Sequence, residues 1–304
     1  MTRRLVESVP NISEGRDKAV IAKLITGIEA VPCVALLDVH VDPDHHRSVF
    51  TMVGEPDAMG TALFGLVCQA QQLIDIRQHQ GEHPRIGAVD VVPWIPLQGV
   101  TMEDCVTYAN ELGARIGQEL EIPVYLYEKA GTVPLRAQLE MVRRGGLSAL
   151  GMCMKIDQDW EPDYGPAMIH PTAGAIAVGA RLFLIAFNVV LKSNDLVVAG
   201  SIAKSIRTSG GGLPSVKAMG VPLVSRGLVQ VSMNLTDYRE TSLRRAFYRV
   251  SREAQRCDIE ILESEIVGLV PRAAWDEKLS HDLKLRPTKS DPVLEYRLEQ
   301  SPVF

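Results

Sequence analysis

The amino-acid sequence predicts a mixed protein, α/β (α+β) in class, built from two modules that each run strand, helix, strand, strand, helix, strand. Three observations support this prediction. Apolar residues recur at helical spacing in some segments and alternate or run together in others. The same order of elements occurs twice along the chain. The length of 304 residues also fits two domains of ordinary size. Each module therefore has the ferredoxin-like βαββαβ order.

The first module begins with a short strand at residues 5–10 and a helix at 17–29 with apolar residues at helical spacing. Apolar, β-branched segments at 34–41 and 48–53 predict a hairpin, and HVDPDHH at 40–46 supplies its turn. Pro56 stands where the start of a helix tolerates proline, so a long helix is expected from there to about residue 76. A strand at 86–95 follows, with Pro93 marking its edge or end.

The second module repeats this order from residue 182. A nearly continuous apolar run at 182–191 predicts a buried strand, followed by an amphipathic helix at 195–207. Strands at 216–221 and 228–234, a helix at 241–257 and a strand region at 259–270 complete the module. Residues from about 278 are expected to form an appended helix or a loose tail.

The region between the modules should contain a helix at 101–120, a strand at 123–127 and a helix at 135–144. Thr101 and Asp104 have the spacing of a capping box at the start of the first of these helices. A crossing rich in glycine and proline, residues 163–174, leads into the second module. The predicted boundary divides the chain into residues 1–178 and 179–304.

Composition argues against several classes of protein. The net charge of -5 is unlike that of a generic nucleic-acid binder. The five cysteines are widely spaced and form no CxxC pair, so we expect buried or half-buried thiols in a reducing compartment rather than a zinc site. The N-terminus lacks the apolar stretch of a signal peptide, and the longest apolar run is too short to cross a bilayer. We therefore expect a cytoplasmic protein that binds neither membrane nor nucleic acid.

The segment GEHPRIGAVD at 81–90 contains the first candidate for chemistry. His83 lies between an acid and a proline, in a predicted helix-to-strand loop, where working side chains are common. Imidazole titrates near neutral pH, so His83 is a candidate to take and return a proton during group transfer. The alternative interpretation is that His83 only fills a surface loop or caps the end of a helix.

The predicted turn HVDPDHHR at 40–47 concentrates possible metal ligands, namely His40, Asp42, Asp44, His45 and His46. Imidazole and carboxylate bind zinc or iron, so a metal site is one interpretation. Because Pro43 interrupts the alternation, these side chains need not face one point, and we favour a polar turn whose aspartates cap backbone groups. Arg47 is suited to holding a carboxylate, because its guanidinium forms a planar fork.

Two glycine-rich segments are further candidates. Residues 163–181, DYGPAMIHPTAGAIAVGAR, would let a backbone approach a flat ligand closely, or would form an interdomain linker in which His170 is structural. Residues 208–220, TSGGGLPSVKAMG, would cradle an anion with Ser209 and Lys217, or would form a flexible surface loop. The first segment lacks the nucleotide-binding motifs GxGxxG and GxxxxGK[ST]. The chain also lacks the hydrolase signatures GxSxG and HExxH.

Taken together, the motifs resemble those of the glutamate formimidoyltransferase family, the formiminotransferase part of formiminotransferase-cyclodeaminase. The matching segments occur in family order over roughly residues 5–270. They are VESVPNISEGRD at 6–17, LLDVHVDPDHHRSVFTMVG at 36–54, LIDIRQHQGEHPRIGAVDVVPWIPL at 73–97, PVYLYEKA at 123–130, DYGPAMIHPTAGAIAVGARLFLIAFNVVL at 163–191 and VQVSMNL at 229–235. GEHPRIGAVDVVPWIPL is highly specific.

This resemblance implies two ferredoxin-like subdomains, residues 1–178 and 179–304, with facing sheets and outer helices and with folate in a tunnel between them. It implies transfer of a formimino group between N-formimidoyl-L-glutamate and tetrahydrofolate, a co-substrate, with His83 as general acid and base and with no metal. It also implies a cytoplasmic homodimer active in histidine degradation. The separate cyclodeaminase domain is expected to be absent.

The resemblance also suggests which residues bind the substrates. Arg47, Arg85 and His40 are substrate-binding candidates, and Lys217 is a further candidate for holding a carboxylate. The stretch implied to contact folate consists of Gly165, Pro166, Ala167, Met168, Ile169, His170, Pro171, Thr172, Ala173 and Gly174.

Two departures from the family pattern leave the role of the hairpin open. The mammalian relatives have an aspartate where this chain has His40 and an asparagine where it has His46. Two alternative functions also stay open. One is an enzyme that handles 5-formyltetrahydrofolate, by formyl transfer or by cyclisation, and the other is a folate-binding protein without turnover. A metal-dependent hydrolase using residues 40–46 is a more distant possibility.

Overall fold

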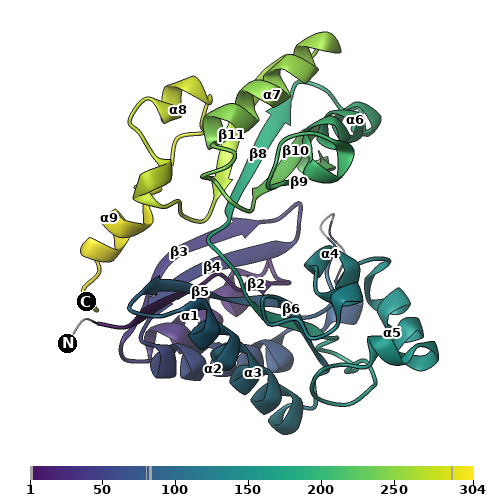
Figure 1. The fold of residues 1–304 in the computed structure, drawn as a ribbon, viewed down its shortest axis with the longest axis vertical. Helices are drawn as coiled ribbons and strands as arrows, with labels where there is room; N and C mark the ends of the chain where they lie inside the picture. The colour runs from purple at the N-terminus through teal and green to yellow at the C-terminus, as the bar shows by residue number, and fades with distance from the viewer. Residues whose placement is uncertain (1–2, 80, 82–83, 289) are drawn as a thin grey trace. The chain divides into compact units, whose positions relative to one another are not determined.

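The chain folds into a mixed α/β structure with two separate sheets, which confirms the predicted class (Figure 1). The computed structural model describes residues 3–79, 81, 84–288 and 290–304. The chain divides into two compact units, residues 1–181 with 301–304 and residues 182–300. The hydrophobic clusters follow the same division, so each unit has its own core.

The first unit contains a seven-stranded sheet. Its strands are β1 (Leu5–Ser8), β2 (Asn11–Ile12), β3 (Val34–Asp42), β4 (Arg47–Gly54), β5 (Val89–Gln98), β6 (Val124–Glu128) and β7 (Ile176–Ala180). β1 and β2 each pair with both β4 and β5, so together they form one strand that is interrupted where Pro10 has no N–H to donate. β7, which the sequence analysis treated as part of a crossing, lies between β5 and β6 and runs parallel to both.

Three helices, α1 (Lys18–Glu29), α2 (Pro56–Leu73) and α3 (Met102–Glu119), cover one face of this sheet (Figure 1). Asp17 caps α1 by accepting from two backbone N–H groups, and Thr101 and Asp104 form the predicted capping box at α3. The helices bury an apolar stripe against inward-facing residues of the strands, including Phe50 and Trp94.

A second, smaller cluster covers the opposite face of the sheet near β5, β6 and β7. It joins Tyr125 and Tyr127 to Leu150 of α5 (Gly146–Ile156) and to Val142 of α4 (Leu139–Val142). The sequence analysis predicted a single helix at 135–144 and missed α5. This helix starts at Gly146, follows Gly145 and has no side-chain cap, so the usual signals of a helix start are absent.

The second unit has the predicted order of strands and helices. Its elements are β8 (Ile185–Leu191), α6 (Leu196–Ile206), β9 (Val216–Leu223), β10 (Leu228–Leu235), α7 (Leu243–Arg256) and β11 (Ile261–Val267). The four strands form an antiparallel sheet in the order β11-β8-β10-β9. Asp195 and Ser242 cap the two helices. Two short helices, α8 (Leu279–Asp282) and α9 (Leu294–Glu299), follow β11.

Two other predictions can be compared with the structure. All five cysteines are free thiols, but Cys33 and Cys257 are exposed rather than buried or half-buried, because both lie in turns outside the core. Over the described ranges, every helix is too short or too polar to cross a membrane.

Candidate functional site

The sheet of the first unit has a polar face on the side opposite α1, α2 and α3. Along β4 the side chains alternate, so Phe50 and Met52 enter the helix-covered core while Arg47, Val49 and Thr51 point the other way. Residues that are opposite each other in antiparallel strands share a face. The strand register therefore places these polar residues together on the polar face: Glu7, Asn11, Asp38, His40, Asp42, Arg47 and Thr51.

The structure also brings together two motifs that are far apart in the sequence. Ala88 N donates to Ala173 O at 2.8 Å, and Ala175 N donates to Ile86 O at 2.7 Å. Gly87 and Gly174 lie at the centre of this pairing. A Cβ on Gly87 would lie 1.9 Å from Ala175 O, so only glycine permits the approach. The segment that follows His83 is thus tied to the end of the predicted folate-contacting stretch.

The stretch Gly165–Gly174 is a well-packed loop. Gly165 and Gly174 have φ of +84° and +77° and press against the backbones of Ile122 and Ile86, respectively. Met168, in the middle of the loop, is 66% exposed. A cavity of about 440 Å³ lies between this loop and α5. Its lining residues are Leu147, Ser148, Gly151, Met152, Lys155, Ala167, Met168 and Ile169.

His170 holds the shape of this loop. Its Nδ1 accepts from Thr172 N at 3.3 Å and from Ala173 N at 3.0 Å, and its Nε2 lies 3.0 Å from the Gln71 side-chain amide. Burial lowers its pKa, which favours the neutral ring that accepts these bonds. These contacts match the structural interpretation of His170 that the sequence left open.

The hairpin between β3 and β4 is built around Asp42. This carboxylate accepts from His45 N at 2.9 Å and lies 2.5 Å from His45 Nδ1. Although burial opposes ionisation, the His45 contacts outweigh it and lower the pKa of Asp42 to about 2. Arg85 then donates to the carbonyls of His46, at 2.9 Å, and of His45. Arg85 therefore braces the hairpin, and its contact with substrate stays a prediction.

His46 adopts a left-handed backbone conformation, with φ of +49°, and its side chain joins Glu14 and His79. Potential ligand atoms of these three residues lie within 4.8 Å of one another, so they could hold a metal ion. His46 Nδ1 accepts from Gly15 N at 3.2 Å, and Glu14 Oε1 accepts from the N–H groups of Arg16 and Asp17. A metal ion would have to displace part of this hydrogen bonding.

The two imidazole rings of this cluster are neutral at ordinary pH. Burial, with a contribution from neighbouring His46, lowers the pKa of His79 to about 4. Burial also lowers the pKa of His46, against the pull of Glu14. The ring centroids are 3.8 Å apart, so two charged rings here would repel strongly. The other possible ligands in the turn do not join this group, because Asp42 and His45 bond to each other.

Arg47, Asp90 and Arg143 form a charged group in the same unit. Asp90 is buried, accepts from Ile86 N at 2.8 Å and forms an ion pair with Arg143. The Nε atoms of Arg47 and Arg143 are buried and have no hydrogen-bond acceptor among the described residues. The sequence analysis did not single out Asp90 or Arg143. Asp90 belongs to the quoted GEHPRIGAVD motif, but no local signal distinguishes Arg143.

The remaining predicted site residues come from several parts of the chain. His83, with Glu82, falls outside the described residues. Lys217 is on β9 of the second unit. The glycine run at 210–212 forms a tight turn, in which Cβ atoms on Gly210 and Gly212 would collide with the backbone at the end of α6. His40 lies half-buried on β3, next to Arg47 and Val49 on the polar face.

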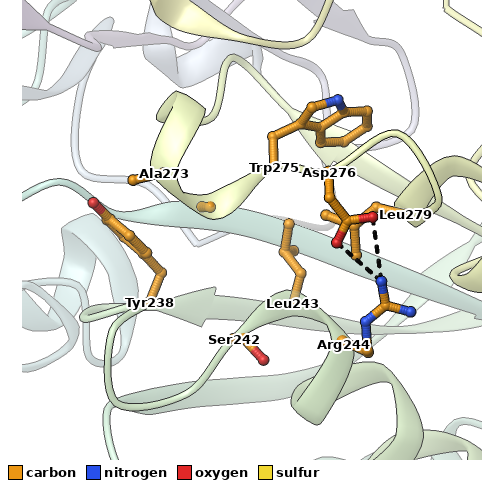
Figure 2. A pocket seen from close by; sticks show the side chains of 9 residues that line it. Tyr238, Ser242, Leu243, Arg244, Ala273, Trp275, Asp276 and Leu279 are labelled. Atoms are coloured by element: carbon orange, nitrogen blue, oxygen red, sulfur yellow. Dashed lines mark hydrogen bonds and ion pairs between the residues drawn. The ribbon is translucent and has the colours of Figure 1, made fainter.

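The second unit contains a cavity of about 230 Å³ between the start of α7 and the segment before α8 (Figure 2). Tyr238 and Trp275 lie on its lining, and Arg244 pairs with Asp276, as the dashed lines in Figure 2 mark. Asp282 also pairs with Arg244. The Arg244 guanidinium thus already has two carboxylate partners and is not free to bind an added anion.

Comparison with known families covers nearly the whole of both units. Residues 5–181 match the N-terminal subdomain of the formiminotransferase domain, and residues 186–280 match the formiminotransferase domain. The chain therefore belongs to the formiminotransferase domain family, which confirms the resemblance found in the sequence.

Individual relatives agree with this assignment. The glutamate formimidoyltransferase of Streptococcus pyogenes serotype M1 is 45% identical over 272 residues, 89% of this chain and 90% of the relative. The glutamate formimidoyltransferase of Thermoplasma acidophilum is 42% identical and covers 98% of both chains. The formimidoyltransferase-cyclodeaminase of Rattus norvegicus is also 42% identical, but the match spans only 51% of that longer protein.

Proposed function

We propose that this protein is a glutamate formimidoyltransferase, an enzyme that moves a formimino group between N-formimidoyl-L-glutamate and tetrahydrofolate. The observation that carries the proposal is the similarity to two proteins of that name, at 45% and 42% identity over 89% and 98% of this chain. Matches of this extent include residues of both units.

His83 is the proposed acid and base, on the strength of its place in the GEHPR motif. In the direction towards glutamate, the amine nitrogen attacks the formimino carbon on N5 of the folate and a tetrahedral intermediate forms. The bond from that carbon to N5 then breaks, and tetrahydrofolate leaves. One imidazole can take the proton from the attacking amine and return it to N5. Holding both substrates together removes much of the entropic barrier.

Folate is proposed to contact the loop Gly165–Gly174. The support is the pairing of residues 86–88 with 173–175, which connects this loop to the segment that follows His83. Small side chains and the exposed Met168 offer an apolar surface of the kind that aromatic ligands favour. Tetrahydrofolate acts as a co-substrate, and the transfer needs no metal.

Each unit is further proposed to be a ferredoxin-like subdomain, with folate bound between their facing sheets. The strand order β11-β8-β10-β9 supports this for the second unit, and the neighbours β3, β4, β1 and β5 support it for the first. By analogy with the family, we also propose a cytoplasmic homodimer that works in histidine degradation.

The decisive experiment supplies the purified protein with formiminoglutamate and tetrahydrofolate and follows 5-formimidoyltetrahydrofolate. Saturable formation of this product supports the proposed activity. Parallel reactions contain 5-formyltetrahydrofolate, with glutamate to test formyl transfer and with ATP to test cyclisation. Turnover of the formyl compound alone would contradict the formimino assignment, and binding of folate without any turnover would indicate a binding protein.

A further inference from the structure

Arg47 forms no direct ion pair within the part of the chain that the structure describes. It begins β4, opposite Asp42 across the hairpin, and its buried Nε has no acceptor among the described residues. The two nearby carboxylates have other partners. Asp42 bonds to His45, and Asp90 bonds to Arg143 and to Ile86 N. Burying a guanidinium is costly unless an anion pairs with it, so this arrangement is typical of an unfilled anion site.

Arg143 is held in place by a feature of β5. The register between β2 and β5 shifts, so that Asn11 is opposite Val91 while Ile12 is opposite Val89, and Asp90 is the extra residue of a β-bulge. Both oxygens of Asp90 are occupied, one by Ile86 N and one by an Arg143 terminal nitrogen. The ion pair fixes one side of the Arg143 guanidinium and leaves its buried Nε unsatisfied.

Arg47 also experiences the charges of neighbouring groups. The charges that act most strongly on it belong to Arg143, Asp42, Asp90 and Arg85. Burial first, and then the repulsion from Arg143, lowers the pKa of Arg47 to about 10. A carboxylate bound beside Arg47 would offset this repulsion.

We propose that Arg47 and Arg143 form the subsite for a carboxylate of the amino-acid substrate, with Asp90 as the residue that positions Arg143. This inference rests on the proposed function. A guanidinium can offer two parallel N–H donors, which suit the two oxygens of a carboxylate.

The position of the subsite favours the amino acid over the glutamyl tail of folate. Asp90 holds Ile86 N, and Ile86 belongs to the same sequence motif as His83, three positions further along the chain. In glutamate the α-carboxylate is on the carbon that carries the reacting nitrogen. In folate the tail carboxylates are separated from N5 by the whole aminobenzoyl group. A subsite this close to the proposed acid and base therefore fits glutamate.

The test measures KM for formiminoglutamate and for tetrahydrofolate in Arg47→Gln, Arg143→Gln and the double variant. Loss of a charge-assisted contact should raise KM for formiminoglutamate by roughly 10- to 100-fold and leave KM for tetrahydrofolate within about twofold. In the double variant, KM for formiminoglutamate should rise by less than the product of the two single-variant increases, because both residues bind one carboxylate. Arg115→Gln, on α3 of the helix-covered face, is the matched control and should change neither constant.

A rise in KM for tetrahydrofolate alone would assign the carboxylate to the folate tail and overturn the proposal. Unchanged constants in folded variants would overturn it as well. Arg143→Gln leaves Asp90 without its cation and can fail to fold, so Asp90→Asn/Arg143→Gln, which removes both charges, serves as the second variant. Arg47→Gln leaves no carboxylate unpaired and keeps the test decisive even if both Arg143 variants unfold.

Calorimetric titration with L-glutamate separates this inference from the proposed function, because it needs no turnover. Binding that Arg47→Gln weakens at least tenfold, in a protein that transfers no formimino group, would uphold the subsite and refute the function. Turnover of the natural protein combined with undiminished glutamate binding by Arg47→Gln would uphold the proposed function and refute the subsite.

Discussion

Side chains of the hairpin between β3 and β4 have different tasks although they are neighbours in sequence. Asp42 and Arg85 bond within the turn and keep it rigid. His46 turns toward Glu14 and His79 in a separate buried cluster. Arg47, next in the chain, lies on the polar face, and its Nε finds no acceptor in the described part of the chain. The hairpin is thus a rigid support that presents one unsatisfied cation.

Replacing His83 by Ala should lower kcat by roughly 10²- to 10⁴-fold, the usual contribution of one acid–base group. The Kd for folinic acid, measured by calorimetry, should stay within about threefold, because proton transfer is not part of binding. His281→Ala is the control, since that imidazole is 97% exposed in the second unit. Near-normal turnover in folded His83→Ala protein would refute the role of His83.

His79 should make the first unit sensitive to acid. Its pKa is about 4 in the folded protein and near 6.5 when unfolded, so the unfolded chain binds more protons between these values. Stability is therefore lost as pH falls from about 6.5 to about 4. The loss from pH 7 to pH 5 should be at most about 2 kcal/mol. Urea unfolding of His79→Gln should show a weaker pH dependence, whereas identical curves would mean that His79 titrates normally.

Chelation should leave the transfer activity intact. Glu14 and His46 already satisfy backbone N–H groups, and an ion would have to displace these bonds, although His79 Nε2 has no partner among the described residues. Dialysis against a strong chelator, followed by the transfer assay, checks this expectation. Activity that disappears and returns with zinc or iron would place a functional metal at Glu14, His46 and His79. His46→Asn would then lower metal content, measured by elemental analysis.

At the scale of elements, the main feature is the contact between the segment at 86–88 and the loop at 173–175. Both segments depend on glycine where they meet, at Gly87 and Gly174. The contact also places β7 between β5 and β6, so it completes the parallel part of the sheet. The proposed folate loop is consequently part of the core structure and not a free linker.

Gly174→Ala should destabilise the first unit and weaken folate binding. A Cβ there would lie 2.4 Å from Ile86 O, in addition to the strain of φ at +77°. Gly146→Ala is the matched control, because φ is +70° and nothing lies within 4 Å of the added Cβ. Backbone strain alone costs about 1–3 kcal/mol in either variant. The free energy of unfolding in urea should therefore fall further for Gly174→Ala than for Gly146→Ala. Equal losses would show that the loop relaxes around the added methyl group.

At the scale of the whole molecule, the two units have separate cores, and the last residues return to the first unit. Phe304 packs its ring under Arg3, with the guanidinium 4.4 Å from the ring centroid. Each unit also has its own sheet. Separate cores are compatible with independent folding of the units.

Neither unit alone should bind folate well, because ligand sites favour the join between domains and the family implies such a site here. Residues 1–181 and 182–300 are expressed separately, checked by circular dichroism and titrated with folinic acid. We expect the Kd to rise at least about tenfold for each fragment relative to the full chain. Undiminished binding by residues 1–181 would place the whole site within the first unit.

The sequence by itself determined the elements whose signals are local. The helices α1, α3, α6 and α7 were predicted from apolar spacing and caps, both of which depend on residues within one or two turns. The long motifs were sufficient to identify the family. The weakly signalled α5 was missed, because glycines occupy its start.

Only the tertiary structure decided which distant residues meet. The parallel position of β7, the bracing role of Arg85 and the pairing of Asp90 with Arg143 all arise from contacts between segments far apart in the chain. Local propensity carries no information about such contacts, because they are selected by packing of the complete sheet. The unsatisfied Nε of Arg47 becomes visible only when Asp42 and Asp90, among the described residues, have been assigned their partners.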